Sequence, residues 1–554
     1  MKSNDHQGKR SGVIAMVLTL LAVVVICAGA VPAQAQTPTV LYSFMNNTSD
    51  ACQPEGNIVQ GRDGFMYGIG VDDGSGACGL NRTGAVYKIS TTGVESVFAN
   101  FPVNYVDCGS GLTLGSDGNF YGTCGTNGNQ GGLIYRLSPA GVFTDLHDFA
   151  VGDQAGGWPP VQASDGNYYG VVVGKQIIYK LTPAGVFSTL FTFSGSDVQP
   201  LSTLFQASDG NLYGTLTICS ISGNRGCVYK VSTAGVFKEV YNFSDPTGSF
   251  PCTGMIQAKN GKLYGATGFG GANSSGNIYN VTTAGVHTSL HDFNNTTDAS
   301  CGGFGFPTVS LLQVTDGSFY GINYAGGLGC GSIYKLTSAN VFSAFLLPVN
   351  NQDGCSLDST LIQNTNGLVY GTAVAGGAPL ANGTFFSVST GDAPFVKLEP
   401  TQKTGNVGAK VGMFGQGFSS ASVVKFGGVA AKSVTLSGKT YLTAVVPAGA
   451  HTGAVTVTTG ATSLTSPQNF NVKPKITSFS PPTGATGALV TIKGSGLTQG
   501  TAVKFGTVKA TTFTVVSDSE VTADVPAGLA LGAVTISITT PGGTANSPTK
   551  FTVN

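Results

Sequence analysis

The sequence predicts an all-β protein: a seven-bladed β-propeller of four-stranded blades followed by two immunoglobulin-like β-sandwiches. A short phrase recurs at intervals of about 50 residues over the first two thirds of the chain, which is typical of propeller-like arrays. A second, Val- and Thr-rich repeat fills the last third. We expect four parts in order: a signal peptide over 1–35, the propeller over 36–393, and sandwiches over 394–473 and 474–554.

The N-terminal segment has the pattern of an export signal. Lys2, Lys9 and Arg10 precede an apolar run over 13–30, and an Ala-Gln-Ala cleavage pattern follows at 33–35. Because the apolar run is long for a signal, an uncleaved membrane anchor is the alternative. We expect cleavage, no membrane span in the mature chain, and a secreted, extracellular or cell-envelope protein.

The composition excludes some partners. The 554 residues include 82 Gly, only 10% are charged, and the net charge is zero. Without a basic stripe to neutralise phosphates, the chain is not expected to bind nucleic acid.

The recurring phrase reads Asp-Gly-x-x-Tyr-Gly, as in SDGNFYG at 116–122. Asp-Gly between apolar runs favours a tight hairpin turn. A second phrase, such as GLIYRLSPAGV at 132–142, and a third, such as FTDLHDF at 143–149, follow in each unit. Each unit therefore holds four short strands, numbered one to four along the chain. The tyrosines that mark the seven units are Tyr67, Tyr121, Tyr169, Tyr213, Tyr264, Tyr320 and Tyr370.

The seventh unit has no fourth strand of its own. A spare segment of the same type, TVLYSF, stands at 39–44 near the mature N-terminus. We expect it to complete the seventh blade, because ring closure removes the exposed sheet edges that promote aggregation.

Residues 39–391 resemble the bacterial GloVer tandem-repeat family. The shared pattern is DGxxYGxT, then a Gly-Gly element such as GFGGAN at 268–273 or YAGGLG at 324–329, then G-x-Y/F-K. Units three and four lack the Gly-Gly element. The resemblance implies a secreted or surface-exposed propeller-like protein and no defined reaction.

The last third repeats at an interval of 79 residues: KFGG at 425–428 returns as KFGT at 504–507. Likewise VPAGAHTGAVTVTT at 446–459 returns as VPAGLALGAVTISITT at 525–540. Short Val- and Thr-rich strands separated by turns favour β-sandwiches. The two units resemble IPT/TIG domains, which implies spacer or adhesive modules.

In a four-stranded blade the tight turns lie on one face of the ring and the long, variable loops on the other, where function usually resides. An acid recurs in every loop that joins strand four to the next blade. Either these acids form a carboxylate ring that binds Ca²⁺, a cationic group or sugar hydroxyls, or each caps a turn through its own backbone. Trp158 either stacks on a sugar or packs beside Pro159 and Pro160. The candidate ligand-binding residues are Asp50, Asp107, Asp153, Trp158, Asp197, Asp245, Asp298 and Asp353.

The ten cysteines that follow the signal all fall in or beside the long loops, and an even number in an exported chain indicates disulfides. Zinc is disfavoured, because the chain has no CxxC pair and only five His. Cys252 and Cys355 have no assigned partner. The predicted pairs are Cys52–Cys78, Cys108–Cys124, Cys219–Cys227 and Cys301–Cys330.

No GxSxG, HExxH or phosphate-binding loop occurs, so we name no catalytic residue and no metal ligand. We expect no cofactor, with Ca²⁺ as the alternative. We expect a monomeric binding or interaction protein whose long-loop face binds an extracellular glycan or a surface protein. The alternative is an extracellular polysaccharide hydrolase or lyase that uses the same face.

Overall fold

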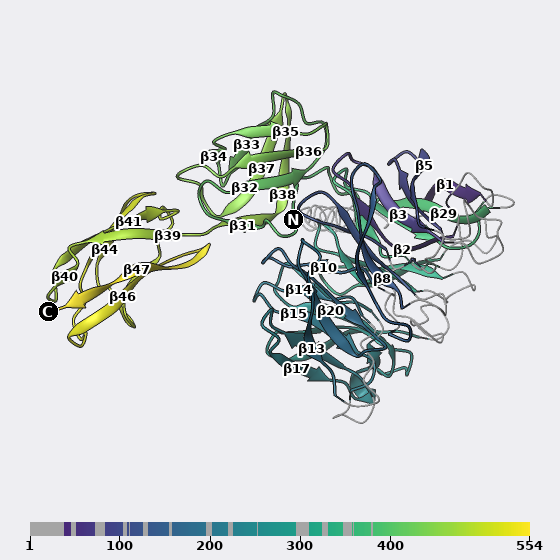
Figure 1. The fold of residues 1–554 in the computed structure, drawn as a ribbon, viewed down its shortest axis with the longest axis horizontal. Coiled ribbons are helices and arrows are strands. Elements are labelled where there is room, and N and C mark those ends of the chain that lie inside the picture. Colours follow the sequence, from purple (N-terminus) through teal and green to yellow (C-terminus); the bar gives the residue numbers. More distant parts are fainter. Residues whose placement is uncertain are drawn as a thin grey trace, which may run out of the picture. The chain divides into compact units, whose positions relative to one another are not determined.

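The computed structural model is all-β and describes most of the chain after residue 37 (Figure 1). One short 3-10 turn, η1 (Asp245–Thr247), accompanies 47 strands in the described residues, and no helix there is long and apolar enough to cross a membrane. The described residues are 38–45, 51, 53–71, 84–102, 108–109, 111–125, 131–153, 158–194, 202–219, 225–251, 253–294, 310–323, 331–346, 357, 359–377 and 381–554.

Seven antiparallel sheets, sheet 1 to sheet 7, occupy the described part of 39–388. Each places strands one to four in consecutive order. The strands are β2 (Pro54–Gln60), β3 (Met66–Gly70), β4 (Ala85–Ile89) and β5 (Glu95–Asn100); β6 (Thr113–Leu114), β7 (Phe120–Cys124), β8 (Leu133–Leu137) and β9 (Phe143–Asp148); β10 (Val161–Gln162), β11 (Tyr168–Val172), β12 (Ile177–Leu181) and β13 (Phe187–Thr192); β14 (Phe205–Gln206), β15 (Leu212–Leu216), β16 (Cys227–Val231) and β17 (Phe237–Asn242); β19 (Ile256–Gln257), β20 (Leu263–Phe269), β21 (Asn277–Val281) and β22 (His287–Asp292); β23 (Leu312–Gln313), β24 (Phe319–Asn323), β25 (Ser332–Leu336) and β26 (Phe342–Leu346); and β27 (Ile362–Gln363), β28 (Val369–Ala373) and β29 (Ala381–Val388) with β1 (Thr39–Met45).

The N-terminal strand β1 completes sheet 7, as the sequence predicts. It pairs antiparallel with β29, with Thr39 opposite Ser387 and Val40 opposite Phe386. Phe44 joins Tyr370 of sheet 7 and Met66 of sheet 1 in one buried cluster. The last sheet therefore packs on the first.

Apolar side chains from each pair of neighbouring sheets form the core of the ring. Between sheets 2 and 3, for example, Tyr121 and Ile134 pack with Tyr168 and Tyr179. Equivalent clusters join every other neighbouring pair. The seven described sheets thus form a closed, propeller-like ring.

The Tyr-Gly of strand two has a packing reason. Gly170 lies opposite Tyr179 of strand three, and a Cβ on Gly170 would lie 2.4 Å from the Tyr179 hydroxyl. Glycine therefore leaves the space that the neighbouring ring fills. The other such pairs are Gly68–Tyr87, Gly122–Tyr135, Gly214–Tyr229, Gly265–Tyr279, Gly321–Tyr334 and Gly371–Phe386.

The hairpin acids have a local role. Asp117 accepts hydrogen bonds from the Asn119 N–H at 3.0 Å and from the Tyr121 hydroxyl at 2.8 Å. The following Gly118 has φ 87°, a conformation that favours glycine. These acids hold the turn to strand two, as expected from the sequence.

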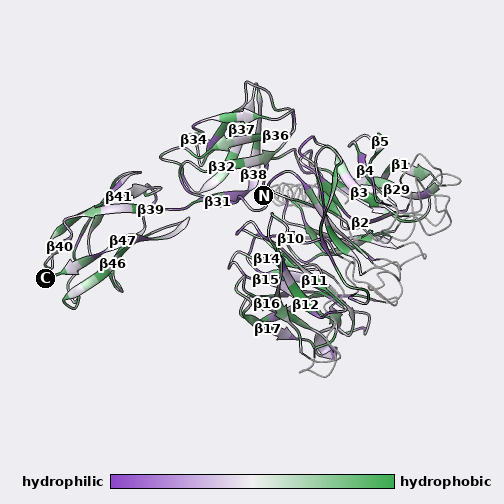
Figure 2. Cartoon of the chain, viewed as in Figure 1, coloured by the Kyte–Doolittle hydropathy of each residue, from purple (hydrophilic) through white to green (hydrophobic). Residues whose placement is uncertain are grey.

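Residues 394–554 form two sandwiches with the same strand order. Each joins a four-stranded to a five-stranded sheet, which fits an immunoglobulin-like fold. Figure 2 shows hydrophobic and hydrophilic residues interspersed along their strands. The strands of the first are β30 (Lys397–Leu398), β32 (Lys410–Phe414), β36 (Tyr441–Val445) and β35 (Val434–Leu436), with β31 (Thr404–Gly405), β38 (Thr462–Val472), β37 (Gly453–Thr459), β33 (Val423–Phe426) and β34 (Val429–Ala430). Those of the second are β39 (Lys475–Ser480), β41 (Leu489–Ser495), β45 (Glu520–Asp524) and β44 (Phe513–Ser517), with β40 (Thr483–Gly484), β47 (Gly543–Val553), β46 (Gly532–Thr540), β42 (Ala502–Phe505) and β43 (Val508–Lys509).

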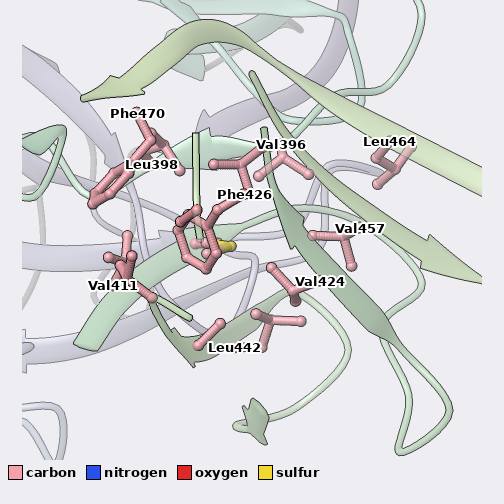
Figure 3. Packing of buried hydrophobic residues seen from close by; sticks show 14 of the residues in the cluster. Val396, Leu398, Val411, Val424, Phe426, Leu442, Val457, Leu464 and Phe470 are labelled. Atoms are coloured by element: carbon pink, nitrogen blue, oxygen red, sulfur yellow. The ribbon is translucent and has the colours of Figure 1, made fainter. Parts of the chain in front are cut away.

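Each sandwich has its own apolar core. In the first, Val396, Val424, Phe426 and Phe470 pack between the two sheets (Figure 3). In the second, residues such as Phe505 form a separate cluster.

Candidate functional site

Of the seven predicted ligand-binding acids, Asp153 and Asp245 lie in the described residues. Asp153 accepts a hydrogen bond from the Ala150 N–H at 2.9 Å and pairs with Lys175 at 2.8 Å. Its described contacts are therefore those of a turn residue with a cationic neighbour. Asp50, Asp107, Asp197, Asp298 and Asp353 lie outside the described residues.

Trp158 is half-buried rather than fully exposed. It packs against the cluster between sheets 3 and 4, and its carbonyl accepts a hydrogen bond from the Thr123 hydroxyl at 3.1 Å. These contacts favour the packing interpretation of this residue.

Asp245 lies beside a hollow of about 600 Å³ on the long-loop face of sheets 4 and 5. Its carboxylate pairs with Arg225 at 2.7 Å, and its carbonyl accepts from the Gly271 N–H at 2.8 Å. These contacts tie three segments together: the loop after sheet 4, the strand-two-to-three loop of sheet 4, and that of sheet 5. The other lining residues are Pro246, Ser249, Phe269, Gly270 and Ser274.

The exposed ring of Phe269 lines this hollow, and the exposed ring of Phe250 packs against the Phe269 ring. Phe250 is 37% exposed and Phe269 is 51% exposed, and their centroids lie 5.7 Å apart in an edge-to-face arrangement. Phe250 belongs to an extra strand, β18 (Ser249–Pro251), that pairs with β20. The Phe250 N–H donates to the Arg225 carbonyl at 2.9 Å, which fixes the segment. This pair was not predicted from the sequence, although the SFP segment departs from the repeat.

Two predicted disulfides lie in described residues, and the structure forms both: Cys108–Cys124 and Cys219–Cys227. The second closes the strand-two-to-three loop of sheet 4, which contains Arg225. Cys219, Cys227 and Glu239 form the one described cluster of potential metal ligands, and its sulfurs are already joined to each other. Cys52, Cys78, Cys301 and Cys330 lie outside the described residues, as do the unassigned Cys252 and Cys355.

A row of strand-one glutamines, the glutamine belt, runs around the tight-turn face and was not predicted from the sequence. In strand one of sheet 4, Gln206 accepts from the Ser164 N–H of sheet 3 at 2.7 Å and donates to the Gly210 carbonyl of its own turn at 2.9 Å. Each such amide links two neighbouring sheets. The signal was a Gln three residues before the hairpin acid or amide in six units: Gln60, Gln162, Gln206, Gln257, Gln313 and Gln363.

Sheet 2 breaks the belt, because Leu114 stands where the glutamine would be. Here Arg62 of sheet 1 reaches across and donates to the Ser116 carbonyl at 2.8 Å. Its guanidinium also binds the Glu399 carboxylate at 2.8 Å and lies 4.6 Å from the Tyr441 ring centroid. Glu399 and Tyr441 belong to the first sandwich, so the departure from the repeat coincides with a contact to the next domain.

A cavity of about 230 Å³ opens at this contact. Strand-one residues of sheets 1, 2, 3 and 7 and residues of the first sandwich line it. Lys397 is among them, and burial, with the neighbouring charge of Lys403, lowers its pKa to about 8 although Glu399 opposes the shift. The lining residues are Asn57, Val59, Gln60, Leu112, Thr113, Leu114, Val161, Gln162, Ile362, Lys397, Glu399, Pro400, Thr401 and Phe414.

Comparisons with known families confirm both sequence resemblances. Residues 160–386 match the Gloeobacter/Verrucomicrobia repeat, and residues 474–553 match the IPT/TIG domain. The chain therefore contains a Gloeobacter/Verrucomicrobia repeat region and a C-terminal IPT/TIG domain. No curated protein sequence matches the chain.

Several solved structures are distantly similar. Virginiamycin B lyase from Staphylococcus aureus is 14% identical with a TM-score of 0.43, and the match covers 64% of this chain and 99% of that one. A fungal alcohol oxidase of the AA5 family is 13% identical with a TM-score of 0.47, covering 79% and 100%. SGBP-B from Bacteroides uniformis is 22% identical with a TM-score of 0.16, covering 28% and 48%. At these values no activity is transferred to this chain.

Proposed function

We propose that the protein is an exported binding protein whose long-loop face binds an extracellular glycan, with the two sandwiches as spacer or adhesive modules. The observation that carries this proposal is the exposed pair Phe250 and Phe269, of which Phe269 lines the hollow. Exposed apolar groups next to a concave surface with a few polar groups are typical of ligand sites. Export rests on the N-terminal sequence pattern and on the disulfides.

The hollow suits a ligand with apolar and hydroxyl-bearing faces. The apolar C–H face of a sugar ring packs on the phenyl groups, since aromatic side chains offer large apolar area. Arg225, Asp245, Ser249 and Ser274 supply donors and acceptors for hydroxyl groups. The Arg225–Asp245 pair is half-exposed, so both groups can bind a ligand without a large desolvation penalty.

The described lining supports binding rather than hydrolysis. A glycosidase requires two carboxyl groups on opposite sides of the scissile bond. Asp245 is the one carboxylate among the described lining residues, and Arg225 already binds it. The two described candidate acids do not form a calcium site, because Asp153 and Asp245 each pair with a cationic side chain. For the five other acids, calcium binding remains a proposal.

The test is a glycan array with the mature protein, followed by a titration of any hit with Phe250→Ala and Phe269→Ala. We expect each variant to weaken binding about tenfold, by loss of stacking area. Val236→Ala is the matched control, because Val236 is 70% exposed but lies in a tight turn of sheet 4. Absence of any glycan ligand, or equal binding by all three variants, would overturn the proposal. Cleavage products after incubation with a hit would favour the hydrolase or lyase alternative.

A further inference from the structure

The cavity at Leu114 has an apolar wall. Leu114, Val161, Ile362 and Phe414 contribute aliphatic and aromatic surface from four different strands, and Leu112 adds to it directly before β6. Its volume of about 230 Å³ far exceeds the ~10–15 Å³ that one water molecule needs. The cavity therefore accommodates a small organic molecule with an apolar body.

The side-chain amides of Asn57 and Gln162, which line the cavity, already make hydrogen bonds within the protein. Asn57 bonds both the N–H and the carbonyl of Leu112, at 2.8 and 2.9 Å. Gln162 bonds the Ser116 N–H and the Gly166 carbonyl, at 2.8 and 3.1 Å. These amides hold the wall and leave little free hydrogen-bonding capacity for a ligand.

The two charged residues that line the cavity, Glu399 and Lys397, differ in whether they have an ion-pair partner. Glu399 is 1% exposed, and its carboxylate accepts hydrogen bonds from Arg62 at 2.8 Å and from the Tyr441 hydroxyl at 2.9 Å. Arg62 thus neutralises Glu399. The side chain of half-buried Lys397 has no hydrogen bond or ion pair among the described residues. Of the two charged lining residues, Lys397 is therefore the one without an ion-pair partner.

We propose that this cavity is a second ligand site that binds a small monocarboxylate with an apolar body, its carboxylate paired with Lys397 and its body against Leu114 and Phe414. The carboxylate of the ligand would neutralise the Lys397 ammonium group, and such a charge-assisted pair is stronger where water is largely excluded. Glutamine at 114 would place an amide in this wall, so the break in the glutamine belt supplies apolar surface to the cavity. This site is independent of the glycan-binding proposal, because it lies on the opposite face of the ring.

The test is a calorimetric titration of the full mature chain with benzoate and with hexanoate at pH 7 and low salt. We expect saturable one-site binding of at least one acid, and none of methyl benzoate. Lys397→Met should weaken binding about tenfold or more, by removal of the charge-assisted pair. Lys403→Met is the control, since Lys403 does not line the cavity. The affinity of Lys403→Met for the acid should stay within about threefold of wild type, because the charge of Lys403 acts on the ligand only at longer range.

A pH series on the unmodified protein provides a second readout. Since the pKa of Lys397 is lowered to about 8, affinity should fall between pH 7 and pH 9.5 as the ammonium deprotonates. This series decides the matter if Lys397→Met does not fold. Absence of saturable binding, equal affinity of wild type and Lys397→Met, or affinity that does not change up to pH 9.5 would overturn the proposal.

Discussion

The two faces of the ring differ in how strictly they follow the repeat. On the tight-turn face, the hairpin, the tyrosine hydrogen bond and the glutamine belt recur from sheet to sheet. On the long-loop face some contacts also recur, such as the bond from the Phe243 N–H to the Gly226 carbonyl, but others belong to one sheet, as does the extra strand β18 of sheet 5. Repeated contacts build the scaffold, and departures from them mark sites. Leu114 lines the cavity, and the extra strand β18 contributes Ser249 to the hollow.

The largest expected effect comes from a repeated scaffold position. Gly170→Ala places a Cβ within 2.4 Å of the Tyr179 hydroxyl in a buried interior, where neither group can move freely. We expect a loss of about 3 kcal/mol or more in unfolding free energy. Denaturant unfolding followed by the fluorescence of Trp158, the only Trp in the chain, measures it.

The double variant Gly170→Ala/Tyr179→Val is the control for this steric explanation. Because the smaller side chain removes the clash, the double variant should lose less stability than the sum of the two single variants. Simple additivity would show that the glycine is needed for another reason.

Two arginine pairs, one on each face, compare a buried with an exposed contact. Arg62–Glu399 and Arg225–Asp245 have similar lengths, 2.8 and 2.7 Å. Glu399 is 1% exposed, whereas Asp245 is 58% exposed. Arg62→Leu leaves a buried carboxylate without its partner and should cost about 3 kcal/mol. Arg225→Leu should cost less than about 1 kcal/mol. Scanning calorimetry of the full chain measures both, and equal losses would contradict the distinction between the faces.

Two neighbouring tyrosines of sheet 3 give a smaller effect. The Tyr169 hydroxyl donates to Asp165 at 2.7 Å, so Tyr169→Phe should cost about 1 kcal/mol. The buried Tyr179 hydroxyl has no hydrogen-bond partner among the described residues. Tyr179→Phe should therefore be neutral or stabilise by up to about 1 kcal/mol. Sheet 7 already has Phe386 at this position. Denaturant unfolding checks both, and equal losses would show that Tyr179 has an unseen partner.

The architecture could be predicted from the sequence because its determinants are local. Asp117, Gly118 and Tyr121 lie within five residues of one another and act within one hairpin. The strand TVLYSF was recognisable because it completes a count of fourth strands.

The candidate sites could not be predicted in the same way, because they depend on contacts between distant segments. Lys397 lies more than 280 residues from Leu114, yet both line one cavity. Phe250 and Phe269 are exposed side by side only because β18 pairs with β20. Leu114 was detectable as the one departure from the glutamine pattern, but the contacts of Arg62 with Ser116 and Glu399 were not.

The smallest expected effect concerns two histidines in strand four, at positions where other sheets have aromatic residues. His147 stacks on Phe187 at 3.9 Å and His287 on Tyr241 at 4.6 Å. Burial lowers the pKa of both imidazoles, with Lys175 adding to the effect at His147. As the pH falls, these two imidazoles therefore bind protons at a higher pH in the unfolded chain than in the folded chain.

Stability supplied by these two groups is present above the unfolded pKa near 6.5 and is lost as the pH falls through that value toward the lower folded pKa. We expect the unfolding free energy to decrease between pH 7 and pH 5. The double variant His147→Phe/His287→Phe should make the unfolding free energy depend less on pH. Phenylalanine fits the position of His287, because Phe187, Phe237 and Phe342 occupy it in other sheets. Denaturant unfolding at a series of pH values provides the measurement. An unchanged slope in the variant would show that other groups set the acid sensitivity of the ring.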